Sequence, residues 1–173
     1  MSMTYDPESE AARAIADLFS PLSLTMLHDT RLAPAWRISF VANFFTGPLY
    51  REVQERFGLS RAGFVILFSL SQQPGLVARD IGLITGLPKN SISRAVSELL
   101  AAGLVSRGRD ASDKRAKPLL ITPEGQAAVD RVLPLFETRQ RAMFAPLTPA
   151  EAADFDRLIE KIIFGMPAWV EPD

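Results

Sequence analysis

Apolar side chains recur along most of the chain at the spacing of one face of a helix. The longest such pattern runs over residues 34–57, and a shorter one, carried by Val77, Ile81 and Ile84, predicts a brief helix that ends at Gly86. The same spacing predicts further helices over residues 8–20, 61–73, 89–102, 123–145 and 149–164. The chain is therefore predicted to be mostly α-helical.

Residues with a preference for helix ends support these boundaries. Ser60 is expected to cap the helix that follows it, and Thr148 with Glu151 has the spacing of a capping box. Gly103 directly follows the predicted helix over residues 89–102, at the position where a glycine commonly ends a helix. Prolines predict interruptions: Pro21 should stop the first helix, Gly47-Pro48 should kink or split the second, and Pro134 should kink the helix in which it lies.

Residues 77–102 predict two short helices joined by the turn Gly86-Leu87-Pro88. One face of the second helix is apolar. The opposite face carries polar and basic residues, namely Lys89, Asn90, Ser91, Ser93, Arg94 and Ser97. This pairing fits a helix-turn-helix, in which the N-terminal part of the second helix contacts the bases of DNA.

Two strand-like runs, residues 104–107 and 119–121, follow this motif. The polar loop between them is longer than the roughly 2–5 residues usual in a hairpin. Its basic residues are Arg109, Lys114, Arg115 and Lys117. A long basic loop on a hairpin directly after such a helix is typical of a wing, and an ordinary solvated loop is the alternative.

The composition excludes several kinds of chemistry. With no cysteine and one histidine, His28, the chain lacks the ligands for a thiolate or multi-histidine metal site and the parts of a cysteine nucleophile. No phosphate-binding loop, dinucleotide fingerprint or zinc-protease motif is present. We therefore expect no enzyme, no metal and no cofactor, and we interpret His28 as a packed or surface histidine in preference to a sensor.

The chain has no secretory-signal pattern and no apolar run of membrane-spanning length, so we expect a cytoplasmic protein without a membrane partner.

Positive charge is concentrated in the middle of the chain, although the net charge is only −1. Residues 86–117 hold seven basic and three acidic residues, a net charge of +4, whereas residues 1–30 hold one and five, a net charge of −4. Such segregation favours one face for an anionic partner. Chance clustering of the charges is the alternative.

Five stretches, in this order, resemble the MarR family of winged-helix transcription regulators. They are residues 64–67, the helix-turn-helix over 77–94, residues 99–107, Asp113-Lys114-Arg115 and residues 119–125. The likeness covers about residues 34–164. The first 30 residues lie outside it, and the internal prolines depart from the smoother helices of the family.

The resemblance implies a mostly α fold with a small β-hairpin wing, in which a winged helix-turn-helix is joined to a helical dimerisation region. Its parts would be an N-terminal extension (1–30), a dimerisation helix (31–57), the DNA-binding domain (58–122) and C-terminal dimerisation helices (123–173). A homodimer is implied, and the many apolar residues of the first and last helices favour it independently. Packing of these helices within one chain is the alternative.

The DNA-binding hypothesis places five residues of the second helix of the motif in the major groove: Lys89, Asn90, Ser91, Ser93 and Arg94. Arginine pairs well with guanine and asparagine with adenine. Two alternatives remain open: Ser91 and Ser93 belong to an ordinary solvated helix surface, and Arg94 anchors a phosphate without reading the sequence. The basic residues of the wing would follow the DNA backbone or enter a narrow minor groove. By the resemblance, Asp113 holds Arg115 or shapes the loop.

Regulators of this family commonly respond to small aromatic or phenolic acids. The candidate effector residues are Trp36, Arg37, Phe40, Asn43 and Phe44, because aromatic rings beside a guanidinium suit a planar carboxylate. An aromatic stripe that only packs in a core is the alternative.

The sequence thus predicts a DNA-binding regulator that acts as a homodimer on a palindromic operator and is modulated by a small aromatic effector. A repressor is the form of regulator that we expect. A winged-helix module that binds protein without specific DNA recognition is the competing hypothesis.

Overall fold

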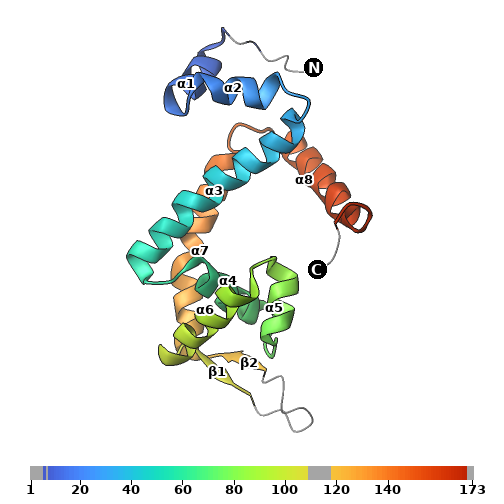
Figure 1. Ribbon diagram of the computed structural model, residues 1–173. Coiled ribbons are helices and arrows are strands. Elements are labelled where there is room, and N and C mark those ends of the chain that lie inside the picture. The colour runs from blue at the N-terminus through green and yellow to red at the C-terminus, as the bar shows by residue number, and fades with distance from the viewer. Residues whose placement is uncertain (1–5, 7, 109–117, 171–173) are drawn as a thin grey trace. The chain divides into compact units, whose positions relative to one another are not determined.

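The computed structural model describes residues 6, 8–108 and 118–170 (Figure 1). The chain divides into two compact units, residues 1–48 and residues 49–173. Helix α3 (Ala33–Phe57) begins in the first unit and ends in the second. It continues through Gly47-Pro48 as one helix, which excludes a split there, while the alternative of a kink stays a prediction. A proline removes one backbone donor from a helix, and the remaining hydrogen bonds of α3 carry the helix across that gap.

The first unit contains a helix that the sequence pattern did not predict. Helix α1 (Glu10–Leu18) ends before Pro21 as expected, but Pro21 then opens a second helix, α2 (Pro21–His28). The Ser20 hydroxyl caps α2 by accepting a hydrogen bond from the Leu22 N–H at 3.2 Å. Proline suits a first turn because that position needs no donor. The leucines of α2 are spread around the helix, so no apolar face marked it in the sequence.

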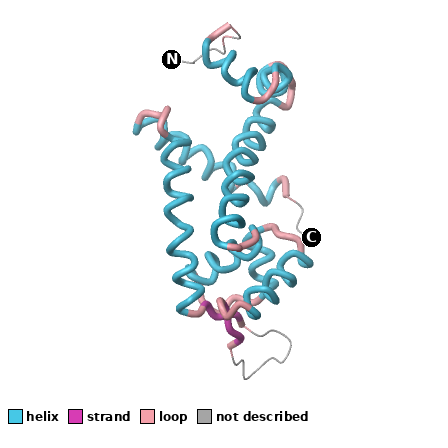
Figure 2. Tube along the Cα trace, turned by 90° about the vertical axis from the view of Figure 1, so that its left-hand side faces the viewer, coloured by secondary structure: helices cyan, strands magenta, loops and turns pink. Residues whose placement is uncertain are grey.

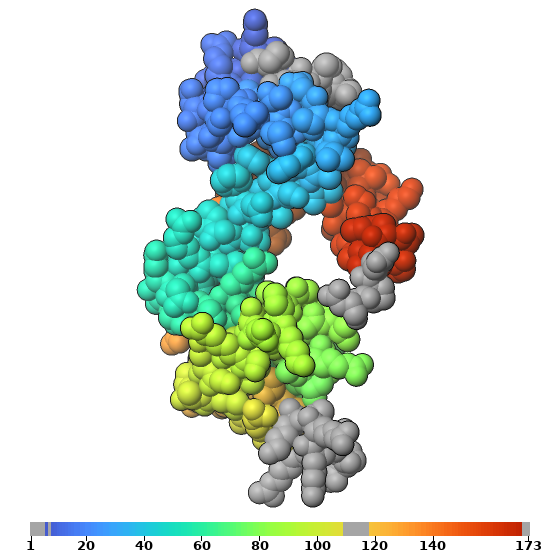
Figure 3. Space-filling model, viewed as in Figure 1, coloured from blue at the N-terminus to red at the C-terminus, as the bar shows by residue number. Residues whose placement is uncertain are grey.

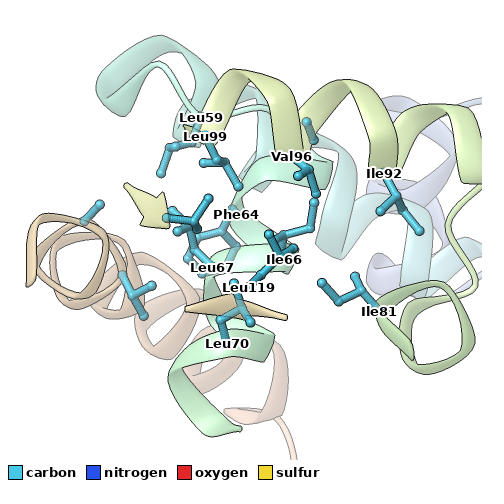
Figure 4. Packing of buried hydrophobic residues seen from close by; sticks show 14 of the residues in the cluster. Leu59, Phe64, Ile66, Leu67, Leu70, Ile81, Ile92, Val96, Leu99 and Leu119 are labelled. Atoms are coloured by element: carbon cyan, nitrogen blue, oxygen red, sulfur yellow. The ribbon is translucent and has the colours of Figure 1, made fainter. Parts of the chain in front are cut away.

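The second unit is built around α4 (Arg61–Gln72), which packs against α6 (Lys89–Ala101) and α7 (Pro123–Phe144). Ser60 caps α4 as predicted, since its hydroxyl accepts from the Gly63 N–H at 3.1 Å. Ile66, Leu67 and Leu70 of α4 are wholly buried. Figure 4 shows these side chains meeting those of α6 and the hairpin in one apolar cluster. Within the described part of the chain, every residue classed as buried is apolar or glycine.

A small antiparallel sheet lies where α7 begins (Figure 2). Strand β1 (Val105–Arg107) pairs with β2 (Leu119–Ile121), with Arg107 opposite Leu119. The other edge of β2 is also bonded, because the Leu119 N–H donates to the Leu76 carbonyl at 2.9 Å and the Gly75 N–H donates to the Leu119 carbonyl at 3.0 Å. The hairpin is therefore tied to the chain that leads into the helix-turn-helix.

Two C-terminal helices complete the unit. Thr122 caps α7 and also donates its hydroxyl to the Gly103 carbonyl at 2.8 Å, which links the end of α6 to the start of α7. Helix α7 continues through Pro134. Helix α8 (Pro149–Phe164) has the predicted capping box of Thr148 and Glu151, and the short 3-10 turn η1 (Met166–Ala168) follows it. No helix in the described ranges is long and apolar enough to cross a membrane.

We predict that Gly125→Ala destabilises the protein. A Cβ at this position would lie 2.1 Å from the Leu104 carbonyl oxygen, and backbone on both sides would have to shift. We expect a loss of roughly 1–3 kcal/mol, the usual cost of overpacking, measured by urea unfolding. Gly47→Ala is the matched control, because nothing lies within 4 Å of its Cβ and alanine is the better helix former. Equal unfolding midpoints for Gly125→Ala and the parent would contradict the close approach.

Candidate nucleic-acid interface

Helix α5 (Ala78–Thr85) and helix α6 form the predicted helix-turn-helix. The turn is made by Gly86 in the left-handed conformation, with φ of 64°. The Thr85 hydroxyl accepts from the Leu87 N–H at 3.3 Å, which adds a local hydrogen bond across the turn. The two helices approach closely, because a Cβ on Gly82 would lie 3.3 Å from the Ile92 side chain.

The packing of α6 determines which of its residues face outward. Ile92, Ala95, Val96 and Leu99 are buried against α4 and α5. Because a helix turns about 100° per residue, the opposite arc is then exposed. All five predicted groove residues lie on this arc and are exposed: Lys89, Asn90, Ser91, Ser93 and Arg94. In Figure 3 the surfaces of α5 and α6, green and yellow-green, adjoin one another.

Two hollows flank the exposed arc of α6. One, of about 840 Å³, is lined by Lys89 and Ser93 on one edge of the arc and by Arg79 and Arg107 from α5 and β1. The other, of about 650 Å³, is lined by Ser91, Arg94 and Glu98 on the other edge and by Arg61 from α4. The exposed arc of α6 is therefore a ridge with cationic side chains on both sides.

Three of these cations were not among the predicted site residues. Arg61, Arg79 and Arg107 are all exposed. Only Arg107 belongs to the basic segment of residues 86–117, and the fold brings all three beside α6. The Arg61 guanidinium also lies over the Tyr50 ring, 5.2 Å from its centroid. Burial raises the pKa of the Tyr50 phenol, and the charge of Arg61 opposes that rise.

An acidic residue that was not among the predicted site residues also lies in this surface. Glu98 accepts a hydrogen bond from Arg94, with 3.0 Å between Oε1 and Nε. Both side chains are exposed, Arg94 to 84% and Glu98 to 53%. The residue spacing of i, i+4 on a helix was the signal that could have found this ion pair.

The predicted wing residues, Arg109, Asp113, Lys114, Arg115 and Lys117, lie outside the described residues.

The candidate effector residues lie in the first unit, where several of them are engaged locally. Phe40 and Phe44 contact the ring of Phe19, the residue after α1, with centroid distances of 5.0 and 4.4 Å. Arg37 donates from Nε to the Leu27 carbonyl at 2.8 Å. These contacts give the aromatic stripe a packing role. Trp36 and Asn43 are exposed, and the effector assignment of the five residues stays a prediction.

His28 ends α2 beside this group. Its Nδ1 lies 3.2 Å from the Nη2 of Arg37. Loss of hydration lowers the pKa of His28 below its ordinary 6.5, and the charge of Arg37 lowers it further, while Asp29 acts in the opposite direction. The described residues contain no cluster of three or more histidine, aspartate or glutamate side chains able to hold a metal ion.

Comparison with known proteins gives one consistent family. A model described as the MarR family matches residues 57–116. The HTH-type transcriptional repressor Rv2887 of Mycobacterium tuberculosis is 29% identical over 105 residues, which cover 61% of this chain and 76% of that protein.

Solved structures of that family share the fold. A MarR-family regulator from Silicibacter pomeroyi has a TM-score of 0.66 and 27% identity, covering 82% of this chain and 97% of the other. The structure of Rv2887 in complex with salicylic acid has a TM-score of 0.59 and 25% identity, covering 77% and 96%.

We predict that His28 titrates below pH 6.5 in the folded protein. A lowered pKa means that the unfolded chain binds the proton more readily, so the contribution of His28 to stability falls as the pH drops from about 6.5 through the folded pKa. Arg37→Gln should raise the pKa of His28, whereas Arg37→Lys, which keeps the charge, should raise it less. The measurement is an NMR titration of the imidazole protons, unambiguous because the chain has one histidine. An unchanged titration in Arg37→Gln would exclude the electrostatic effect of Arg37.

Proposed function

Because this chain belongs to the MarR family of winged helix-turn-helix regulators, we propose that it is a transcriptional regulator that binds DNA as a homodimer and responds to a small aromatic acid. A repressor is the form of regulator that we favour, since the relative Rv2887 is named as one. The observation that carries the proposal is the exposed polar arc of α6 with cations on both flanks.

In this proposal α6 enters the major groove. Asn90 is near the middle of the exposed arc and has the donor and acceptor that recognise adenine, and Arg94 has the fork that recognises guanine. Lys89, Arg61, Arg79 and Arg107 contact phosphates on the two sides. The basic residues of the wing extend this contact along the backbone: Arg109, Lys114, Arg115 and Lys117, with Asp113 shaping the loop.

The apolar face of α8 supports the homodimer. Phe155, Leu158 and Ile162 follow one another at helical spacing and are 42–50% exposed in the single chain. No residue of α8 is buried. A second copy that covers this face removes its apolar surface from water and brings two copies of α6 to a palindromic site, about one DNA turn apart.

An effector acts in this proposal by its preference for one arrangement of the dimer. The relative Rv2887 was solved with salicylic acid, a planar aromatic carboxylate. A similar acid, held near Trp36, Arg37, Phe40, Asn43 and Phe44, would lower DNA affinity only by its preference for the arrangement that mismatches the operator. Such a regulator acts in the cytoplasm and catalyses no reaction.

We predict distinct effects for two α6 variants in fluorescence anisotropy with the DNA upstream of the gene, at two salt concentrations. Arg94→Ala should lose about 1–3 kcal/mol on the specific site and relax the preference at one base pair. Lys89→Ala should weaken binding to all sequences and reduce the slope of log affinity against log salt by about one. Arg157→Ala is the control, because Arg157 is likewise exposed and paired, with Asp154 at 3.0 Å, but lies on α8.

If both α6 variants bind DNA with the affinity and salt dependence of the parent, the assigned face is wrong. No binding of the parent to any DNA, even at low salt, would favour the protein-interaction module instead.

We predict that Leu158→Glu converts the dimer into a monomer. A carboxylate in the centre of an apolar interface cannot be solvated there, so association is lost. Analytical ultracentrifugation measures the change. Ala153→Glu adds the same charge to the opposite face of α8 and should remain dimeric. If Leu158→Glu also remains dimeric, the interface does not include this face.

A further inference from the structure

Glu98 is the one acidic residue of α6, a helix that the structure describes completely. It lies at the edge of the exposed arc, beside the hollow lined by Arg61 and Arg94. A carboxylate on a surface that approaches DNA phosphates repels them, so Glu98 weakens binding unless it has another effect.

The stability of α6 does not account for Glu98. It lies in the last turn of the helix, where the exposed carbonyl groups disfavour a negative charge. The order of the pair, arginine first and glutamate four residues on, is also the less favourable of the two orders on a helix. The pair of Glu52 and Arg56 on α3, at 2.6 Å, has the favourable order.

The contact with Glu98 restricts how Arg94 can bind. Glu98 Oε1 accepts a hydrogen bond from Arg94 Nε, and the two Nη groups are not part of that contact. Those groups form the fork that pairs with O6 and N7 of guanine. The carboxylate also offsets the charge of Arg94, which reduces the attraction of that side chain for any phosphate within reach.

We propose that Glu98 is a specificity-determining residue that positions Arg94 for guanine and weakens its indiscriminate contact with phosphates. This inference rests on the proposed function, that the protein binds DNA. Exposed to water, an ion pair of this kind holds its geometry only weakly. When DNA covers it and water leaves, the same contact strengthens and fixes the direction of the fork.

The test begins with a duplex that the parent protein selects from a random-sequence pool, and with a scrambled duplex of the same composition. Glu98→Ala should bind the scrambled duplex more tightly and reduce the ratio of selected to scrambled affinity by about tenfold. Its salt slope should become steeper by about one, because the released Arg94 takes up a phosphate. Glu52→Ala is the matched control, as it breaks a second exposed glutamate–arginine pair and removes the same charge, and it should keep the parental ratio.

Two further variants separate position from charge. Glu98→Gln keeps an oxygen that can accept from Arg94 Nε but has no charge. It should bind the scrambled duplex as Glu98→Ala does, yet keep more of the preference for guanine in a repeated selection. In the Arg94→Ala background, Glu98→Ala should cause no additional loss of that preference, because Glu98 acts through Arg94.

If Glu98→Ala keeps the ratio of selected to scrambled affinity and the base preferences of the parent, this inference alone is overturned. Absence of any sequence preference in the parent would overturn the proposed function and this inference with it. A melting temperature of Glu98→Ala no lower than that of the parent is expected, which distinguishes a positioning residue from one that only stabilises the helix.

Discussion

Four buried side chains of α6 determine the orientation on which the whole proposed DNA-binding surface depends. Four side chains are each at most 6% exposed: Ile92, Ala95, Val96 and Leu99. Full burial of an isoleucine, valine or leucine side chain contributes about 1.5–3 kcal/mol to the stability of the fold. A slip of one residue would turn the helix by about 100° and present apolar side chains to the groove. The face proposed for an anionic partner is thus specified by residues on the opposite, buried side of the helix.

The boundaries of the elements were predictable because local chemistry encodes them. Ser60 and Thr148 accept backbone hydrogen bonds at helix starts, and Gly103 adopts a φ of 69° after α6. Helix α2 escaped prediction because its apolar residues encircle it, and Pro21 was interpreted as an end although it also suits a first turn. Helix α3 continues through Pro48 because the helix on both sides stabilises it, although the local sequence Gly47-Pro48 disfavours a helix.

The candidate site was only partly predictable. The exposed residues of α6 follow from helical spacing, but Arg61, Arg79 and Arg107 come from other elements and become neighbours only in the fold. In the first unit, the spacing along α3 left two interpretations of its rings and guanidinium open, an effector site and a packed stripe. The structure places Phe40 against Phe19 and Arg37 on the Leu27 carbonyl, contacts between segments that the spacing along α3 does not specify.

Strand β2 is bonded on both sides, to β1 and to the Gly75-Leu76 backbone. A strand held in this way cannot slide along one neighbour without breaking its hydrogen bonds to the other. The base of the hairpin and the entry to α5 therefore move together. In the proposed complex with a duplex, their contacts would therefore form together, and the loss of one contact would shorten the lifetime of the complex more than it slows its formation.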